Sequence, residues 1–167
     1  MSDLAWQIPR LTLWAALSVA GVACLLPAPA AHGAEATSVA GLWLVEAKDA
    51  VVDIEPCGDK LCGTVVWLKQ PRRRDGSVRL DDKNPDAELR SRPVCGLELM
   101  NGFKSAGPNE RKDGHIYSAD EGATYSAKMA LTDPNTLKVR GFIGISLFGK
   151  SQIWTRAPDD AARCTAS

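Results

Sequence analysis

Residues 125–143, YSAKMALTDPNTLKVRGFI, decide the fold of this 167-residue chain. In the first half, the residues at every second position form one apolar face: Tyr125, Ala127, Met129 and Leu131. In the second half, a similar face comprises Leu137, Val139, Gly141 and Ile143. This alternation indicates strands with one buried side. The TDPNT segment between the halves is rich in turn-forming residues, so the stretch predicts an antiparallel hairpin.

Short runs of the same kind, separated by turns rich in Gly, Pro and Asp, cover most of the chain after residue 40. They predict about eight strands, at residues 42–47, 51–56, 61–68, 94–100, 115–118, 125–131, 137–143 and 152–156. Eight short strands joined in chain order favour an all-β fold, a single small antiparallel up-and-down barrel, because closure removes the exposed sheet edges. A β-sandwich is the alternative.

The first and last predicted strands carry a matching pair of residues. GLW opens the first strand and WTR closes the last, so a closed barrel would place Trp43 beside Arg156. The guanidinium could then lie over the indole ring. Lipocalins look similar, with a Gly-x-Trp start and an arginine on the last strand, and this resemblance makes the expected barrel lipocalin-like or calycin-like.

Several longer blocks resemble a bacterial family of exported proteins known as domain of unknown function 2147. The blocks are GLWL, PCGDKLCGTVVWL, DDKNPDAELRSRPVCGL, GHIYSADEGATYSAKMAL and LKVRGFIGISLFGKSQIWTR. They follow one another over nearly the whole chain beyond the N-terminal segment. The resemblance implies export and a barrel-like β fold, and it implies no established reaction and no catalytic residues.

The N-terminus has the pattern of an export signal. Arg10 precedes an apolar run at 11–26, which is followed by small residues and prolines. The run is about 16 residues long, shorter than the roughly 20 that span a bilayer. We therefore expect residues 1–33 to be a cleaved signal peptide and the mature protein to be periplasmic or secreted. A retained anchor and acylation at Cys24 are lesser alternatives.

Three positions fit signal cleavage, after Ala30, Gly33 or Ala36. The mature chain is then one domain, with the β-barrel at residues 37–157 and a polar C-terminal tail at 158–167. No transmembrane segment is expected after cleavage.

The charge balance bears on the partner. The chain has 20 basic and 20 acidic residues, and the signal segment removes one of each. Nucleic acid and anionic membranes bind clustered excess positive charge, so neither is expected as the main partner. The sequence indicates no particular oligomeric state.

Four cysteines remain after cleavage: Cys57, Cys62, Cys95 and Cys164. An even count in an exported protein points to disulfides. Of the three connectivities, we favour Cys57–Cys62, because CGDKLC reads as a short hairpin turn, together with Cys95–Cys164. The spacings lack the C-x-x-C clips of structural zinc sites, so no metal and no cofactor is predicted.

The long polar segment at residues 70–93 is the most function-like part of the sequence. Its candidate ligand-binding residues are Asp82, Asn84, Arg90 and Arg92. Such a charged set could bind an anionic group or order the barrel mouth. The other interpretation is that these side chains only hold the loop together through bonds to its backbone.

Other polar and aromatic residues are assigned by their strands. Tyr117 and Tyr125 are candidates for ligand contact, with packing as the alternative. The charged residues on strands with an apolar opposite face are expected to point outward into solvent: Asp53, Glu55, Lys128 and Arg140.

Residues 144–151, GISLFGKS, match the phosphate-loop pattern G-x-x-x-x-G-K-[ST]. A working phosphate loop opens a helix, whose N-terminal amides hold the phosphates. Here SQIWTRAP follows and has strand character. We therefore interpret this segment as the turn between the last two strands, with Lys150 in solvent, and predict no nucleotide site.

The sequence shows no recognisable catalytic set. Ser146 lies in G-x-S-x-x-G, unlike the G-x-S-x-G nucleophile elbow, and His115 is the one histidine left after cleavage. We expect a non-enzymatic exported protein whose barrel binds a small apolar or amphipathic ligand, or an envelope component. The alternative is a disulfide-stapled structural or protein-interaction module of the periplasm. A hydrolase using Asp82, Asn84, Arg92 and His115 ranks third.

Overall fold

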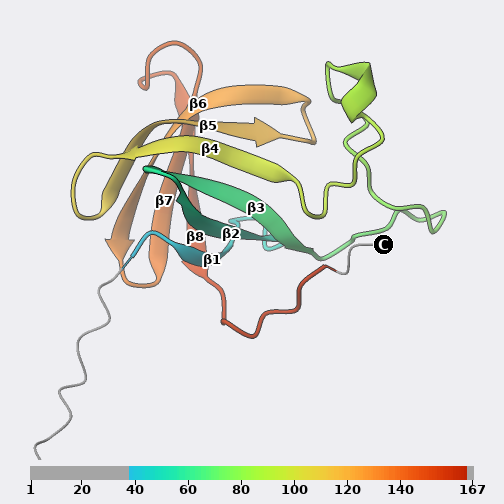
Figure 1. Ribbon diagram of the computed structural model, residues 1–167, viewed down its shortest axis with the longest axis horizontal. Helices are drawn as coiled ribbons and strands as arrows, with labels where there is room; N and C mark the ends of the chain where they lie inside the picture. The colour runs from blue at the N-terminus through green and yellow to red at the C-terminus, as the bar shows by residue number, and fades with distance from the viewer. Residues whose placement is uncertain (1–37, 165–167) are drawn as a thin grey trace, which may run out of the picture. The chain divides into compact units, whose positions relative to one another are not determined.

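The structure is a computed structural model that describes residues 38–164 (Figure 1). The expected signal peptide, with its cleavage positions Ala30, Gly33 and Ala36, lies outside these residues, as does the end of the C-terminal tail. Within 38–164, no helix is long and apolar enough to cross a bilayer.

Eight antiparallel strands form a closed barrel. They are β1 (Gly41–Leu44), β2 (Ala50–Cys57), β3 (Lys60–Leu68), β4 (Glu98–Ser105), β5 (Glu110–Ser118), β6 (Ala123–Asp133), β7 (Thr136–Phe142) and β8 (Gly149–Arg156). Each strand pairs with the next in the chain, and β8 pairs with β1. The up-and-down barrel predicted from the sequence is confirmed, and the sandwich alternative is wrong.

Two strands differ clearly from their predicted bounds: β5 begins at Glu110 rather than at residue 115, and β4 is shifted along the chain. The strand predicted at 94–100 is β4, Glu98–Ser105, because Gly96, with φ of 86°, turns the chain before the strand begins. Asn101 and Gly102 have the sequence of a tight turn, yet they lie inside β4. Gly102 has φ of 75°, and the register with β3 shifts nearby, so the pair forms an irregularity in a continuous strand.

The buried core fills the end of the barrel where the β2–β3, β4–β5 and β6–β7 turns lie. We call this end the closed half. Its large buried side chains are Trp43, Val52, Ile54, Met100, Phe103, Met129, Leu131, Leu137 and Trp154. Packing is tight, because a Cβ atom on Gly114 would lie only 2.4 Å from the Phe103 ring.

Arg156 covers the end of the closed half. It pairs in register with Trp43, and its guanidinium carbon lies 4.2 Å from the indole centroid. The same guanidinium donates to the carbonyls of Ser38 at 2.7 Å and Pro134 at 2.9 Å. One side chain therefore ties the segment before β1 and the β6–β7 turn to β8.

Two disulfides are present, and they follow the favoured pairing. Cys57–Cys62 spans the β2–β3 turn, with a Cα–Cα distance of 5.8 Å. Cys95–Cys164 joins the end of the long β3–β4 connection to the C-terminal tail. The second bond closes a far longer loop, and by chain entropy it is expected to contribute about 4 kcal/mol, against about 2 kcal/mol for the first.

The C-terminal tail packs on the outer face of β1 and β2. Ala157 is buried there with Leu42 and Val51. Arg163 pairs with Asp53 at 3.0 Å under this cover. The expectation that Asp53 is solvated is therefore wrong: it faces outward, but it is only 8% exposed.

Candidate functional site

Four connections lie at the other end of the barrel, which we call the open half, and residues of all four line one cavity. They comprise residues 45–49, 69–97, 119–122 and 143–148. The barrel interior beneath them is hollow, with a cavity of about 750 Å³. Apolar side chains provide most of its wall: Val45, Val65, Leu68, Val94, Leu99, Ile116, Val139 and Trp154. Small-molecule sites in proteins have similar volumes, about 300–1,000 Å³.

The cavity exists because some inward-facing residues in the open half are small. Ala50 and Gly141 line it, and a Cβ on Gly141 would meet its neighbours only at 3.6 Å. A larger side chain at Gly141 would therefore extend into the space. Trp154 borders the cavity at the closed half, and its indole N–H donates to Gln152 Oε1 at 2.7 Å. This wall therefore offers apolar contact without an unpaired indole donor.

A buried carboxylate fixes the 70–93 loop beside the cavity. Asp81 has no exposed surface and accepts hydrogen bonds from three side chains. Tyr117 Oη donates at 2.6 Å, Asn84 Nδ2 at 2.8 Å, and Arg92 Nε at 3.0 Å. Arg92 also forms the ion pair, at 2.9 Å. A buried charge is tolerable when it is paired in this way, so the network holds the loop onto the end of β5.

The same environment changes the acidity of Tyr117. Burial, followed by its hydrogen bond to Asp81, raises the pKa of Tyr117 to about 12. Tyr117 therefore keeps its proton, and with it the bond to Asp81, throughout the ordinary pH range.

Asp81 and Asp82 are adjacent in the loop, and the sequence favoured Asp82 as the candidate, whereas Asp81 is the buried one. Asp82 is exposed and pairs with Arg73 at 2.8 Å. The sequence does not show which of the two adjacent aspartates turns inward, because side chains in a loop do not alternate regularly between inward and outward positions. A signal was nevertheless present: a tyrosine at a strand end and an arginine nearby can satisfy a single buried acid.

The other candidates also act mainly within the loop. Arg90 donates to the carbonyl oxygen of Asn84 at 2.7 Å. Asn84 Oδ1 accepts from the Asp86 amide at 2.9 Å. These contacts are the loop-holding bonds of the second interpretation. Tyr125 lines the cavity and donates to Glu121 at 2.7 Å, which raises the pKa of Tyr125.

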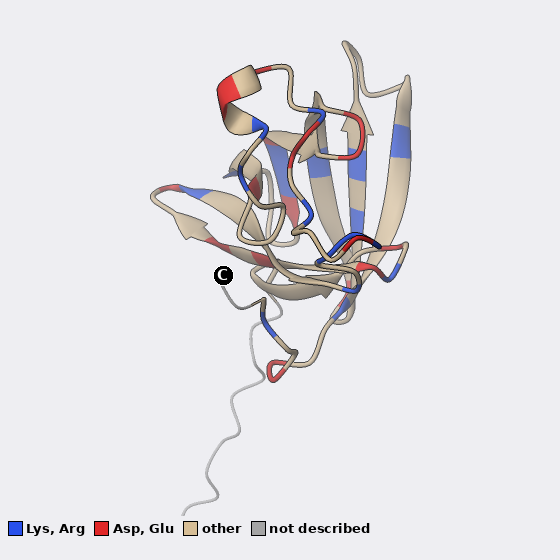
Figure 2. Cartoon of the chain, turned by 90° about the vertical axis from the view of Figure 1, so that its right-hand side faces the viewer, with Lys and Arg blue, Asp and Glu red and all other residues tan. Residues whose placement is uncertain are grey.

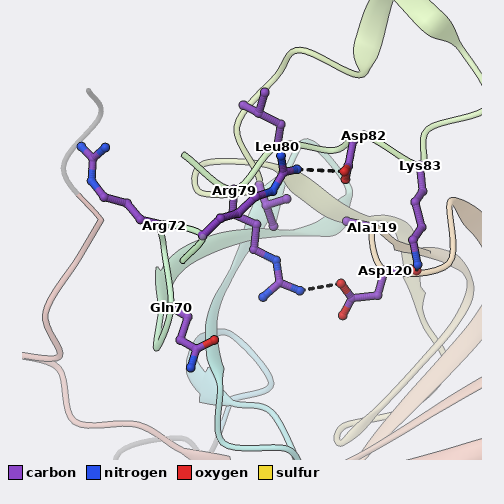
Figure 3. Close-up of a pocket in the computed structure, with 10 residues that line it drawn as sticks. Gln70, Arg72, Arg79, Leu80, Asp82, Lys83, Ala119 and Asp120 are labelled. Carbon is purple, nitrogen blue, oxygen red and sulfur yellow. Dashed lines mark hydrogen bonds and ion pairs between the residues drawn. The ribbon is translucent and has the colours of Figure 1, made fainter. Parts of the chain in front are cut away.

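A second hollow of about 240 Å³ adjoins the cavity mouth (Figure 3). We call it the cationic recess, and its charged lining residues are Arg72, Arg73, Arg79, Lys83, Asp82 and Asp120. Four residues line both hollows: Arg79, Val94, Ala119 and Asp120. The apolar cavity and the cationic recess are therefore neighbours that share a wall. Figure 2 shows that basic and acidic residues are interspersed along the 70–93 loop.

The hairpin tip at residues 143–148 lies at the mouth, where Ile143 and Phe148 also line the cavity. Four large apolar side chains are between 60 and 75% exposed: Ile143, Ile145, Leu147 and Phe148. Arg140 braces the tip by donating to the carbonyls of Ser146 at 2.8 Å and Leu147 at 3.1 Å. Arg140 thus faces outward, but it serves the hairpin and is not simply solvated. Large apolar side chains exposed together on one short segment mark contact sites in many proteins.

The phosphate-loop motif forms this hairpin. Gly144 has φ of 69° within the turn, and Lys150 lies exposed in β8. A strand follows the motif where a nucleotide site needs a helix N-terminus.

Further chemistry at the mouth is sparse. His115 is exposed on β5, on the side opposite to the core-packing Ile116. Over residues 38–164, no group of three or more His, Cys, Asp and Glu side chains comes together as a metal site. Every buried side-chain polar atom in that range has a hydrogen-bond partner.

Comparison with known proteins places this architecture. The protein HP1028 of Helicobacter pylori, whose structure is described as belonging to the lipocalin family, is similar with a TM-score of 0.64 and 21% identity. The likeness covers 74% of this chain and 85% of that one, and it shows a shared fold. Comparison with curated proteins gave no match. The sequence model of the bacterial family described as "Uncharacterized protein conserved in bacteria (DUF2147)" matches residues 41–156, from the first strand to the last, and the chain belongs to this family.

Proposed function

We propose that this protein is a non-enzymatic binding protein whose barrel holds a small apolar or amphipathic molecule. The cavity of about 750 Å³ is the observation that carries the proposal. Its wall is mainly aliphatic and aromatic, and it opens at one end between four connections. Burying an alkyl chain there would be favourable by roughly 25 cal/mol for each Å² of apolar surface removed from water. The lipocalin description of HP1028 agrees with a binding role.

The non-enzymatic part rests on what the mouth offers. The buried Asp81 and the half-buried Tyr117 are engaged in holding the loop. His115, the only histidine of the described chain, is exposed on the outer side of β5. Acyl transfer needs a nucleophile, its base and an oxyanion site at one point, and the exposed position of His115 supports a role other than that base.

Native mass spectrometry of protein exported to the periplasm tests the binding. We expect a co-purifying small molecule on the wild-type protein, and its loss in Gly141→Phe, whose ring would occupy the cavity. Gly141→Ala is the matched control, because its Cβ fits at ordinary contact distance. If Gly141→Phe retains the ligand in full, the ligand binds outside the cavity. A wild-type protein that carries no ligand and binds no added alkyl compound would refute the proposal.

Export is part of the same proposal and has its own test. The Arg10 start, the apolar run at 11–26 and the two disulfides support it, since disulfides persist in oxidising compartments. We expect the intact mass of the isolated protein to show loss of the residues up to Ala30, Gly33 or Ala36. A full-length mass together with a cytoplasmic location would contradict export.

The exposed tip at residues 143–148 favours a second candidate function, a protein-interaction module. Its four apolar side chains are exposed, and two of them, Ile145 and Leu147, do not line the cavity. A pull-down from envelope extracts should compare wild type with a variant carrying Leu147→Ser and Phe148→Ser. A partner captured only by the wild type would support the module, and identical captures would count against it.

A further inference from the structure

We propose that the ligand is an amphiphile with an anionic head group, which the cationic recess binds while the apolar chain lies in the barrel. This inference rests on the proposed function, since it names the chemistry of the molecule in the cavity. The head group is a carboxylate or a phosphate ester.

The shared wall of the two hollows is the first argument. Arg79, Val94, Ala119 and Asp120 line both the cavity and the cationic recess. A chain that leaves the apolar wall near Val94 therefore meets the guanidinium of Arg79 next. An alkyl ligand with a charged end would fit both surfaces at once, whereas a wholly apolar one would leave the recess unused.

The charge of the recess is the second argument. Four cationic and two anionic side chains line it, an excess of two positive charges. Arg73 pairs with Asp82, and Arg79 with Asp120. Arg72 and Lys83 instead donate to the carbonyls of Gly76 and Asp120, and among residues 38–164 they form no ion pair with a carboxylate.

The backbone that carries Arg79 and Lys83 is held in place by contacts with other segments. The Arg79 amide donates to Pro71 at 2.9 Å, and its carbonyl accepts from Val94 at 3.0 Å. Lys83 lies between Asp81 and Asn84 of the buried network, and its carbonyl sits so close to Gly122 that a Cβ there would lie at 1.9 Å. The network around Asp81 thus positions Lys83 against the β5–β6 turn.

The carboxylate that now meets Arg79 is weakly held. The Asp120 side chain is 73% exposed, against 34% for Arg79. Exposed ion pairs contribute little to stability, so an incoming anion can replace Asp120 at little cost. In Figure 3, Arg79 and Lys83 both point toward Asp120, which marks the position where a head group would lie.

Calorimetric titration with three probes of equal chain length tests the inference: decanoate, monodecyl phosphate and decanol. Charge-assisted hydrogen bonds are stronger than neutral ones, so we expect both anions to bind at least about tenfold more tightly than the alcohol. The preference should shrink as salt is added, because the recess is partly exposed.

Paired variants assign the effect to the recess. Arg79→Gln with Lys83→Gln should reduce anion binding to the level of decanol, and thermal unfolding of the variant beside the wild type shows whether it is folded. Lys104→Gln with Lys112→Gln removes the same charge from exposed positions in β4 and β5, toward the closed half, and should change nothing. Asp120→Asn should tighten anion binding by up to about fivefold, since it removes the competing carboxylate.

The outcomes separate this inference from the binding function. If decanol binds and the anions bind no more tightly, the head-group site is refuted while the cavity function stands. If inorganic phosphate alone binds as tightly as monodecyl phosphate, the recess is an independent anion site and the inference is wrong. If none of the three probes binds, the proposed function itself fails.

Discussion

The two halves of the barrel are built from the same strands and differ in what points inward. In the closed half, Trp43, Phe103 and Leu137 fill the interior, and each is at most 1% exposed. In the open half, Ala50 and Gly141 leave the space unfilled. The strand pattern thus fixes the barrel, and the size of the inward residues decides which half is core and which half is a site.

The halves also differ in how their ends are finished. The connections at the closed end are short turns, and Arg156 ties two of its segments together. At the open end, the long connection of β3 to β4 carries a buried carboxylate, and the 143–148 tip carries exposed apolar side chains. Loops that carry function are commonly held by such a rigid frame.

The largest expected effect comes from the disulfide that reaches the open end. Removing Cys95–Cys164 by a double serine substitution should lower the free energy of unfolding by about 4 kcal/mol, against about 2 kcal/mol for Cys57–Cys62 at the closed end. Urea unfolding of both variants measures the difference. Equal losses would show that the tail contributes little to holding the open half.

A matched pair of leucines compares the interiors directly. Leu137→Ala in the closed half should cost about 3 kcal/mol, because it opens a new void in a filled core. Leu99→Ala removes a side chain that already borders the cavity, and it should cost about 1–2 kcal/mol. Thermal unfolding with a chemical-denaturant check gives both values. A larger cost for Leu99→Ala would mean that the open half is filled.

The buried network predicts a pH dependence at the open half. The pKa of Tyr117 is raised in the folded protein to about 12 from an ordinary value near 10. The folded state therefore holds the proton more tightly, so the stability from this group is complete below about pH 10 and is lost as the pH rises toward 12.

Tyr117→Phe should remove that alkaline step and cost roughly 2 kcal/mol at neutral pH, since a buried charged acceptor loses one donor. Tyr125→Phe is the control, because Tyr125 bonds to Glu121 at the surface. Unfolding measured from pH 8 to 12 distinguishes them. An alkaline step as large in Tyr117→Phe as in the wild type would assign it to another group.

The smallest effect is expected at the hairpin tip. Leu147→Ser should change the free energy of unfolding by less than about 0.5 kcal/mol, because the side chain is 75% exposed. The reading comes from the same denaturant curves. A loss of several kcal/mol would mean that the tip packs against the barrel and is not free for a ligand or partner.

The sequence predicts the barrel well because strand alternation and short turns are local signals. From Tyr125 to Leu131, every second residue belongs to the inward face. The position of β4 could not be read in this way, since Gly96 and Gly102 take left-handed conformations that the letters alone do not assign. The signal peptide and the site assignments stay predictions.

The candidate site was less predictable for a physical reason. A cavity depends on the summed volumes of residues from many strands, and no short motif records that sum. Asp81 likewise became buried only because Tyr117, Asn84 and Arg92 approach it in three dimensions. By contrast, residues 144–151 match the phosphate-loop motif in sequence, but they lack the following helix that phosphate binding requires.

Contact quenching of Trp154 fluorescence by a decanoate brominated along its chain tests the central claim most directly. Trp154 borders the cavity, whereas Trp43 is enclosed in the closed half and Trp67 packs under the C-terminal tail. We predict saturable quenching in the wild type and its disappearance in Trp154→Phe. Quenching of equal depth in Trp154→Phe, or none in the wild type, would contradict a ligand held inside the open half.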